Sequence, residues 1–346
     1  MSPLALEGAV DCDVHCAPAS IDALVPYMDE YWRDYVENAG MYLSPTLTGT
    51  YPEAVSPAPP SDVEALRSDV LDPWGLRTAV LSCVSAFDVS RNPYYETALC
   101  KAINDWLRVE WLERDERLRA SMVVPTLDPE AAIEEIERVG SDPRFVAVLL
   151  PIRVDARWGT KRFHPLHEAI ARNDLVLALH AWGRIGLAPT ASGSTHSYFE
   201  DYLFNSQFIA QAQVMSLVAE GVFERAPELR VALLECGFSW VPPMLWRFDK
   251  DWKAVWREVP WLKARPSEYV QRHFRATTAP AQLPADREQA ARLAEMLGAE
   301  EFLVFASDFP HRHGEGNLDV LLDVLGEDGR AAVKGGNAAA LYGLPQ

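Results

Sequence analysis

Short apolar runs alternate along the chain with longer segments that have the spacing of amphipathic helices. The sequences VAVLL at 146–150, LVLALH at 175–180, VALLE at 231–235 and FLVFAS at 302–307 are almost entirely apolar. Strands of this composition are buried on both faces, as in a parallel sheet whose two faces are covered by helices. The pattern therefore predicts an α/β fold with a parallel sheet.

The same alternation predicts a (β/α)₈ TIM barrel. Eight strands are expected at 9–14, 77–83, 119–124, 145–150, 175–180, 230–235, 274–277 and 302–307, with helices among them at 96–114, 129–139, 207–225, 243–256 and 285–297. Eight strands with intervening helices favour a barrel over an open doubly wound sheet, and barrels of this length form one domain. Residues 1–346 are therefore expected to form a single domain with long βα loops. No GxGxxG or GxxxxGK(S/T) sequence follows a predicted strand, which argues against a nucleotide-binding fold.

Two of the expected loops are long. Residues 40–62 form a predicted loop insertion, because the stretch 44–61 carries five prolines. Residues 183–206 follow the predicted fifth strand and are polar at 190–195, and loops of this length are often lids or binding loops. We therefore expect an active-site lid loop at 183–206, in which His196 is a candidate substrate contact. A solvated histidine is the alternative.

Charge and composition exclude several classes of partner. The 346 residues are 49% hydrophobic and carry 32 basic and 50 acidic side chains, a net charge of −18. This balance argues against a nucleic acid or an anionic membrane as partner, since both attract clustered Lys and Arg. No apolar run approaches the roughly 20 residues that a membrane span needs. The N-terminal residues do not resemble a signal peptide, and the five cysteines show no CxxC spacing, so we expect reduced thiols and a cytoplasmic location.

The polar residues at the ends of predicted strands indicate a metal site. Four strands end in, or run directly into, Asp, His or Glu, namely Asp13, His15, His180, Glu235 and Asp308. The carboxyl ends of barrel strands meet at one mouth, where active sites lie. Two carboxylates and two imidazoles suit Zn²⁺, Mn²⁺ or a similar divalent ion. Each residue alone could instead be a helix cap or a hydrogen-bonded polar group, which is the more common case.

Several motifs resemble the amidohydrolase-related family that includes aminocarboxymuconate-semialdehyde decarboxylase and the resorcylate-type decarboxylases. They are DCDVHCAP at 11–18, LVPYMDEYWRDY at 24–35, LHAWG at 179–183, GVFERAPELRVALLECGFSW at 221–240, LWRFD at 245–249 and FASDFPH at 305–311. Each motif is weak by itself, but their order and spacing are specific, and the resemblance covers nearly the whole chain.

The resemblance implies a ligand set. Many members of the family begin with Asp-x-His-x-His, followed three residues later by Pro. Aligning that proline with Pro18 places the second histidine at His15 and a carboxylate, Asp13, where those members have the first. The competing register pairs His15 with Ala17 and leaves one ligand missing. The implied metal ligands are Asp13, His15, His180 and Asp308, with Asp11 and His311 expected beside them.

The resemblance also bears on proton transfer and on the number of ions. The decarboxylases have His-Gly-Gly at the sixth strand, where this chain has Glu235-Cys236-Gly237. Glu235 would thus replace the family's acid/base histidine, and Asp308 is the second candidate catalytic carboxylate. Binuclear amidohydrolases place a carboxylated Lys on the fourth strand, whereas this strand ends LLPIR at 149–153. One divalent ion, Zn²⁺ or Mn²⁺, is therefore expected.

Four residues are candidates for substrate contact. Arg247 lies in LWRFD, where the resembling decarboxylases direct an Arg toward a substrate carboxylate, a group that a guanidinium binds bidentately. A surface salt bridge of Arg247 with Asp249 or a neighbour is the alternative. Arg153 is a weaker candidate for the same role, and Trp182 is a candidate wall for a conjugated substrate. The fourth candidate for substrate contact is His196, in the expected lid loop. His313 is expected to be exposed, and the histidines of the HPLHEAI segment are expected at the surface or in a cap.

Together these features imply a metal-dependent enzyme of the amidohydrolase superfamily. The leading hypothesis is a carboxy-lyase that removes CO₂ non-oxidatively from an aromatic or conjugated carboxylic acid. The alternative is a hydrolase of an amide, lactone or C–C bond, in which the ion activates water and Asp308 or Glu235 takes the proton. A third is a catalytically inactive binding barrel, because Asp13 and Glu235 replace two histidines. A small carboxylic acid is the expected partner, and a homodimer is expected because barrels of this family often pair.

Overall fold

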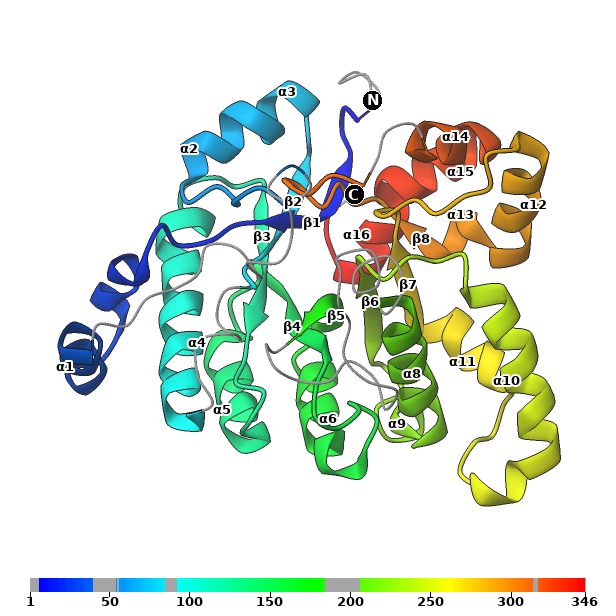
Figure 1. Cartoon of the computed structure of the whole chain (residues 1–346), viewed down its shortest axis with the longest axis horizontal. Helices are drawn as coiled ribbons and strands as arrows, with labels where there is room; N and C mark the ends of the chain where they lie inside the picture. The colour runs from blue at the N-terminus through cyan, green and yellow to red at the C-terminus, as the bar shows by residue number, and fades with distance from the viewer. Residues whose placement is uncertain are drawn as a thin grey trace.

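The computed structural model describes residues 6–39, 54, 56–84, 92–183, 206–313 and 317–345, which form the predicted (β/α)₈ barrel (Figure 1). Its eight strands pair in parallel in the order β1 to β8. The strands are β1 (Val10–His15), β2 (Thr78–Ser82), β3 (Leu118–Val123), β4 (Phe145–Arg153), β5 (Val176–Gly183), β6 (Arg230–Leu234), β7 (Phe274–Thr277) and β8 (Leu303–Val304). All eight predicted strands are present, and their order confirms the prediction of a barrel.

The ring closes between β1 and the segment that follows β8. The N–H of Cys12 donates to the carbonyl of Phe305 at 3.0 Å. The N–H of Asp308 donates to the carbonyl of Asp13 at 3.1 Å. Closure of the ring therefore brings β1 and the segment after β8 together at Asp13 and Asp308, two of the predicted metal ligands.

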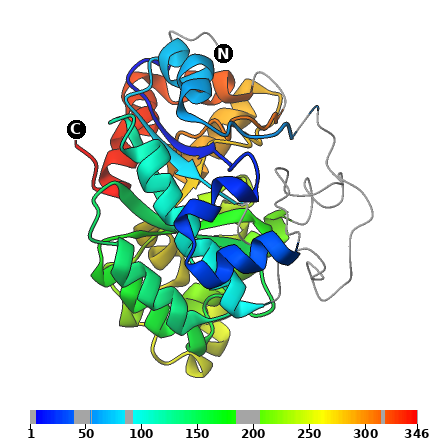
Figure 2. The ribbon, with the colours of Figure 1, turned by 90° about the vertical axis from the view of Figure 1, so that its left-hand side faces the viewer.

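Helices surround the strands, as Figure 1 shows. They are α1 (Glu30–Ala39), α2 (Val63–Leu66), α3 (Asp72–Trp74), α4 (Pro93–Leu107), α5 (Pro129–Val139), α6 (His164–Arg172), α8 (Ser206–Ala219), α9 (Val222–Arg225), α10 (Val241–Val255), α11 (Pro266–His273), α12 (Arg287–Leu297), α13 (Ala299–Phe302), α14 (Asn317–Val324), α15 (Gly326–Ala331) and α16 (Asn337–Tyr342). Short 3₁₀ or π segments are η2 (Ile21–Ala23), η3 (Val25–Tyr27), η4 (Arg67–Leu71), η5 (Arg108–Leu112), η6 (Lys161–Phe163), η8 (Trp256–Glu258) and η9 (Ala332–Gly336). After β1, the segment with α1 crosses one side of the barrel (Figure 2), where the Trp32 ring lies 5.4 Å from that of Tyr95 on α4.

Local sequence explains several helix boundaries. The helix α4 begins at Pro93, earlier than predicted, because the Asn92 side chain accepts the N–H of Tyr94 at 3.0 Å and caps the helix. The predicted helix at 207–225 is divided into α8 and α9 at Gly221, whose φ of +73° lies in the left-handed region. A Cβ at Gly221 would lie 2.5 Å from Cδ1 of Trp261, so glycine is required there.

The core consists of the buried faces of the strands and the helices packed on them. In β4 every residue except Arg153 is buried, as the almost continuous apolar sequence predicts. In contrast to these apolar residues, β1 contributes three polar side chains to the interior: Asp11, Asp13 and His15 are all fully buried. Among the described residues, no helix is long and apolar enough to cross a membrane. Most of the predicted loop insertion at 40–62 and nearly all of the predicted lid at 183–206 lie outside the described residues.

Candidate metal centre

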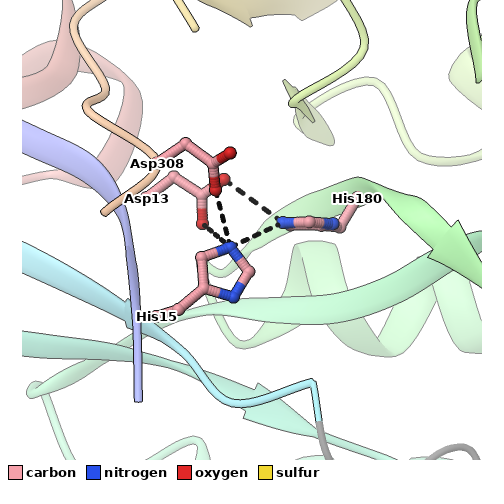
Figure 3. A group of neighbouring side chains, drawn as sticks. All are labelled: Asp13, His15, His180 and Asp308. Atoms are coloured by element: carbon pink, nitrogen blue, oxygen red, sulfur yellow. Dashed lines mark hydrogen bonds and ion pairs between the residues drawn. The ribbon is translucent and has the colours of Figure 1, made fainter. Parts of the chain in front are cut away.

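Four side chains meet at the carboxyl end of the barrel (Figure 3). Asp13 and His15 come from β1, His180 from β5, and Asp308 from the segment after β8. One potential ligand atom from each lies within 4.8 Å of the others, and all four residues are fully buried. The structure thus brings together the four residues that were predicted from the sequence as metal ligands, in the register that uses Asp13 rather than Ala17.

The facing atoms are two imidazole nitrogens and the carboxylate oxygens. Nε2 of His15 lies 3.2 Å from Nε2 of His180 and 2.8 Å from Oδ1 of Asp308. Nε2 of His180 lies 3.3 Å from Oδ2 of Asp13. Neither oxygen of Asp13 has a hydrogen-bond partner among the described residues, although both are buried. Burying carboxylate oxygens without a partner is costly, so this donor set fits one divalent cation held among the four side chains.

Backbone geometry at the site is unusual. Only three non-glycine residues with positive φ occur in the described part of the chain, and two of them, Glu235 and Asp308, belong to this site. Both have φ of +56°, in the left-handed region. A non-glycine residue in this region costs about 1–3 kcal/mol, and such strain concentrates at functional sites. The strain is consistent with a precise requirement for where these two carboxylates point.

Glu235 lies beside the four-residue cluster, directly after β6. Its Oε2 is 3.8 Å from Nε2 of His180, and its Oε1 is 3.9 Å from Nε2 of His313. Burial, reinforced by the nearby negative charge of Asp308, raises the pKa of Glu235 to about 7. The carboxyl group can therefore gain or lose a proton near neutral pH, which is what an acid/base group requires.

His311 contacts the ligand Asp308 directly. Its Nδ1 lies 3.1 Å from both Oδ1 and Oδ2 of Asp308. Burial alone would lower the pKa of His311, but the charge of Asp308 and the hydrogen bond to it raise the pKa to about 9. A protonated His311 thus stabilises the ionised form of Asp308, whose pKa is held well below its usual range despite burial.

Asp11 accepts hydrogen bonds from the backbone next to two of the metal-ligand candidates. Its Oδ1 accepts the N–H of Asp13 at 3.3 Å and the N–H of Ser307 at 3.0 Å. Burial raises the pKa of Asp11 to about 7. Asp11 and His311 both lie next to metal-ligand candidates, as their positions in the sequence predicted.

His313 is placed differently from the sequence-based expectation. The prediction that it is exposed is wrong, because the side chain is only 11% exposed and its Nε2 contacts Oδ2 of Asp308. The segment after cis-Pro310 folds back over the cluster and carries His313 with it. The only feature of the sequence that could have placed His313 at the site is its short distance along the chain from Asp308. That distance does not show whether the loop between them turns inward.

Trp182 and Arg153 lie at the rim formed by β4 and β5. The Trp182 ring is buried, and its centroid lies 6.2 Å from that of His180 in an edge-to-face arrangement. Arg153 pairs across the sheet with Gly183, where an added Cβ would lie 2.0 Å from Cβ of Arg153. The two strands therefore approach closely at this rim. Contact of either residue with a substrate stays a prediction.

Arg247 is placed away from the four-residue cluster, at the surface. Arg247 lies on α10 with a side chain that is 84% exposed, and its Nε is 3.2 Å from Oδ2 of Asp251. This is the surface ion pair that the sequence left open as the alternative, so the structure does not support a substrate contact by Arg247 within one chain. His196 lies outside the described residues.

Comparison with known proteins gives a family and solved structures with the same fold. The family model described as Amidohydrolase matches residues 10–344. The γ-resorcylate decarboxylase of Rhodococcus jostii (strain RHA1) is 27% identical over 305 residues, which cover 82% of this chain and 88% of that protein.

Two solved structures have the same fold. The 5-carboxyvanillate decarboxylase of Sphingomonas paucimobilis superimposes with a TM-score of 0.67 at 22% identity, covering 98% of this chain and 99% of that one. The dihydroxybenzoic acid decarboxylase of Polaromonas sp. JS666, with bound manganese and the inhibitor 2-nitroresorcinol, superimposes with a TM-score of 0.65 at 18% identity, covering 97% of both chains. At these identities, the two structures establish the fold alone.

Proposed function

The chain belongs to the amidohydrolase family, and on this basis we propose that it is a divalent-metal-dependent carboxy-lyase of an aromatic or conjugated carboxylic acid. The observation that carries the proposal is the buried set of four ligand atoms within 4.8 Å of one another, with the acidic Glu235 3.8 Å from His180. The γ-resorcylate decarboxylase of R. jostii, which aligns over most of the chain, supports the choice of reaction.

Asp13, His15, His180 and Asp308 would hold the ion. When bound, the ion supplies Lewis-acid stabilisation of the negative charge that develops on the substrate's oxygens. We propose Mn²⁺ rather than Zn²⁺, since the set provides two carboxylates, ligands that suit Mn²⁺, and manganese is the ion in the Polaromonas decarboxylase structure.

Glu235 is the proposed proton donor. In decarboxylation, the bond between the carboxyl group and its carbon breaks, CO₂ leaves, and the electron pair stays on that carbon, which then takes a proton. A carboxyl group with a pKa of about 7 is partly protonated at neutral pH and can donate that proton, after which it recovers one from solvent. Asp308 remains ionised beside His311 and so keeps its role as a ligand.

Trp182 and Arg153 are the proposed substrate contacts. The buried indole of Trp182, beside His180, offers an apolar surface to a flat conjugated ring. Arg153, at the adjacent strand end, offers a guanidinium to the acid group.

Hydrolysis is the alternative reaction. The observation that favours it is the carboxylate of Glu235 at the position where the resembling decarboxylases have a histidine. In its ionised form, Glu235 could take a proton from an attacking water, as a general base. A lactone or an amide would then replace the carboxylic acid as substrate.

We further propose that the protein works as a homodimer in the cytoplasm. The apolar side chains Trp246, Val255 and Trp256, on and just after α10, are 61%, 49% and 45% exposed, and a partner subunit would cover them. All five cysteines are free and buried, which suits a reducing compartment.

The reaction is tested by measuring CO₂ release. The metal-depleted protein is reconstituted with MnCl₂ and incubated with 2,6-dihydroxybenzoate, 5-carboxyvanillate and related aromatic acids. The proposal predicts CO₂ and the decarboxylated phenol in equal amounts, lost in EDTA-treated protein and in Asp308→Asn. Turnover of lactones or amides without CO₂ release from any acid would establish the hydrolase instead.

A further inference from the structure

We propose that Gln213, on α8, positions the rim formed by β4 and β5 and so sets the affinity for the substrate's acid group. Its buried side-chain amide forms hydrogen bonds to the end of β4 and to the loop that follows it. The inference rests on the proposed function, because Gln213 would act through the proposed contact of Arg153 with that acid group. It assigns a role to a helix residue outside the set of metal ligands.

The rim is shaped by a bulge in β5. The register between β4 and β5 shifts between Pro151 and Arg153. Across this shift one residue of β4, Ile152, faces two residues of β5, the second of which is Trp182. Bulges re-aim the side chains around them and are common beside active sites. This bulge comes directly after His180, so it lies between a metal-ligand candidate and the proposed substrate contacts.

Alternation along β4 places Arg153 on the inner face of the barrel. Pro151 pairs with His180, whose imidazole belongs to the cluster inside the ring. Paired residues of neighbouring parallel strands point to the same face of the sheet, and so do residues two apart in one strand. Arg153 therefore shares the face of His180. The backbone between Pro151 and Arg153 sets the direction in which the guanidinium points.

Gln213 holds that stretch of backbone. Its Nε2 donates to the carbonyl of Ile152 at 2.7 Å, and its Oε1 accepts the N–H of Trp158 at 3.0 Å. The indole Nε1 of Trp158 in turn donates to the carbonyl of Pro151 at 2.7 Å. Gln213 and Trp158 are 3% and 1% exposed, so water does not compete for these bonds. The amide thus fixes two consecutive carbonyls, one directly and one through Trp158.

The helix that carries Gln213 is closely docked on the loop after β4. A Cβ at Gly159 would lie 2.2 Å from the backbone of Ser216, one turn after Gln213 on α8, so only glycine permits this approach. On the neighbouring α6, Nε2 of His167 lies 2.8 Å from the carbonyl of Trp158. The loop is therefore held by two helices, which gives Gln213 a fixed frame from which to orient the strand end.

Asn104 holds the end of β3 in the same way and provides a matched control. From α4, its Nδ2 donates to the carbonyl of Val123 at 2.8 Å and its Oδ1 accepts the N–H of Val123 at 2.9 Å. Its Nδ2 also donates to Oε1 of Glu135 at 2.7 Å, so losing this amide should cost at least as much stability. The difference from Gln213 is that β3 carries no residue proposed to contact the substrate.

The test compares the kinetic effects of removing each amide. Gln213→Met and Asn104→Leu keep most of the volume, remove the hydrogen bonds and should both lower the midpoint of urea unfolding. The manganese-loaded proteins are assayed with 2,6-dihydroxybenzoate and 5-carboxyvanillate. Gln213→Met should raise KM about 10- to 100-fold and leave kcat within about threefold of the wild type, because it misplaces a binding group. Asn104→Leu should change neither constant.

A second substitution at the same position guards against a folding defect. Gln213→Glu keeps an acceptor for the N–H of Trp158 but puts a carboxylate oxygen where the donor to Ile152 was. It should also raise KM, and it replaces Gln213→Met in the comparison if that variant does not fold. Equal increases in KM for Asn104→Leu and the folded Gln213 variant would show a general loss of structure and would overturn the inference.

A double-mutant cycle shows whether Gln213 acts through Arg153. Arg153→Met should raise KM by itself, and adding Gln213→Met should raise it no further, because the positioned group is already gone. A normal KM in Gln213→Met, or two effects that multiply, would overturn the inference and leave the proposed function intact. A normal KM in Arg153→Met would remove the contact on which the inference rests. A wild type that neither binds nor decarboxylates these acids would overturn both the inference and the proposed function.

Discussion

The backbone N–H of Ser307 donates a 3.0 Å hydrogen bond to Oδ1 of Asp11, a residue 296 positions earlier in the chain. The same oxygen accepts the N–H of Asp13 at 3.3 Å. Because Asp308 follows Ser307, one buried carboxylate holds the backbone beside two of the proposed metal ligands. Residues that orient ligands in this way are part of how a protein controls metal affinity.

Replacing Asp11 should therefore weaken metal binding. Asp11→Ala removes the acceptor for both N–H groups, and we expect the affinity for Mn²⁺ to fall about 10- to 100-fold, the usual effect of losing a residue that supports a ligand. Asp11→Asn keeps an acceptor oxygen and should lose much less. Titration calorimetry on both variants measures the difference. Equal affinities in Asp11→Ala and the wild type would show that this hydrogen bonding does not position the ligands.

Removing a ligand should have a larger effect than removing its support. In His180→Ala one of the four facing donor atoms is lost, and we expect Mn²⁺ affinity to fall by more than about 100-fold, with activity falling in parallel. The matched control is His164→Ala, because His164 is also buried but bonds to the carbonyl of Gly159 instead of to a ligand. Metal content after dialysis is the measurement. Retention of a full equivalent of metal by His180→Ala would remove His180 from the site.

Substituting Glu235 should affect the chemical step. With Glu235→Gln, the proton donor is lost while the volume is kept, and general acid catalysis is typically worth about 10²–10⁴-fold in rate. We expect kcat to fall by that factor while Mn²⁺ is still bound. Glu268→Gln, on the distant α11, is the control and should leave kcat unchanged. A Glu235→Gln protein with normal kcat and bound metal would contradict the assignment of Glu235 as proton donor.

Most of the barrel could be predicted from the sequence, because strands buried on both faces leave an apolar signal that local sequence carries. The strand β4 begins at Phe145, as expected, and extends three residues beyond the predicted end, to Arg153. The predicted strand at 302–307 is shorter in the structure: Phe302 ends α13, and β8 spans only Leu303–Val304. Apolar residues alone do not distinguish the end of a buried helix from the start of a buried strand.

The site was less predictable where it depends on how loops fold. His313 was expected at the surface, yet the segment after β8 turns it onto Asp308. His164 and His167 were also expected at the surface or in a cap, and both are buried with a hydrogen bond to a backbone carbonyl. Tertiary contacts decide these positions, and no periodicity in the local sequence reports them.

The buried His167 predicts a dependence of stability on pH. Its Nε2 lies 2.8 Å from the carbonyl of Trp158, while Nδ1 is buried and has no hydrogen-bond partner among the described residues. Burial lowers the pKa of His167 from 6.5 to about 4. The unfolded chain therefore takes up a proton as the pH falls through 6.5, whereas the folded protein takes it up only near pH 4. The stabilising contribution is fully present above pH 6.5 and is lost between 6.5 and 4.

This dependence can be measured by urea unfolding of metal-free protein at pH 7 and pH 5. For the wild type, His167 should account for a loss of about 2 kcal/mol over this interval, because each pKa unit corresponds to about 1.4 kcal/mol. His167→Gln keeps a donor for the Trp158 carbonyl but cannot titrate, so its free energy of unfolding should fall by about 2 kcal/mol less. Identical losses in the two proteins would refute the assignment.

The central claim, that strand ends far apart in the chain share a cation, is tested most directly by anomalous X-ray scattering at the manganese absorption edge. Crystals grown with MnCl₂ should show a strong anomalous peak within bonding distance of Asp13, His15, His180 and Asp308. Absence of a peak among these four side chains in metal-replete crystals, or a peak only elsewhere on the protein, would contradict the account.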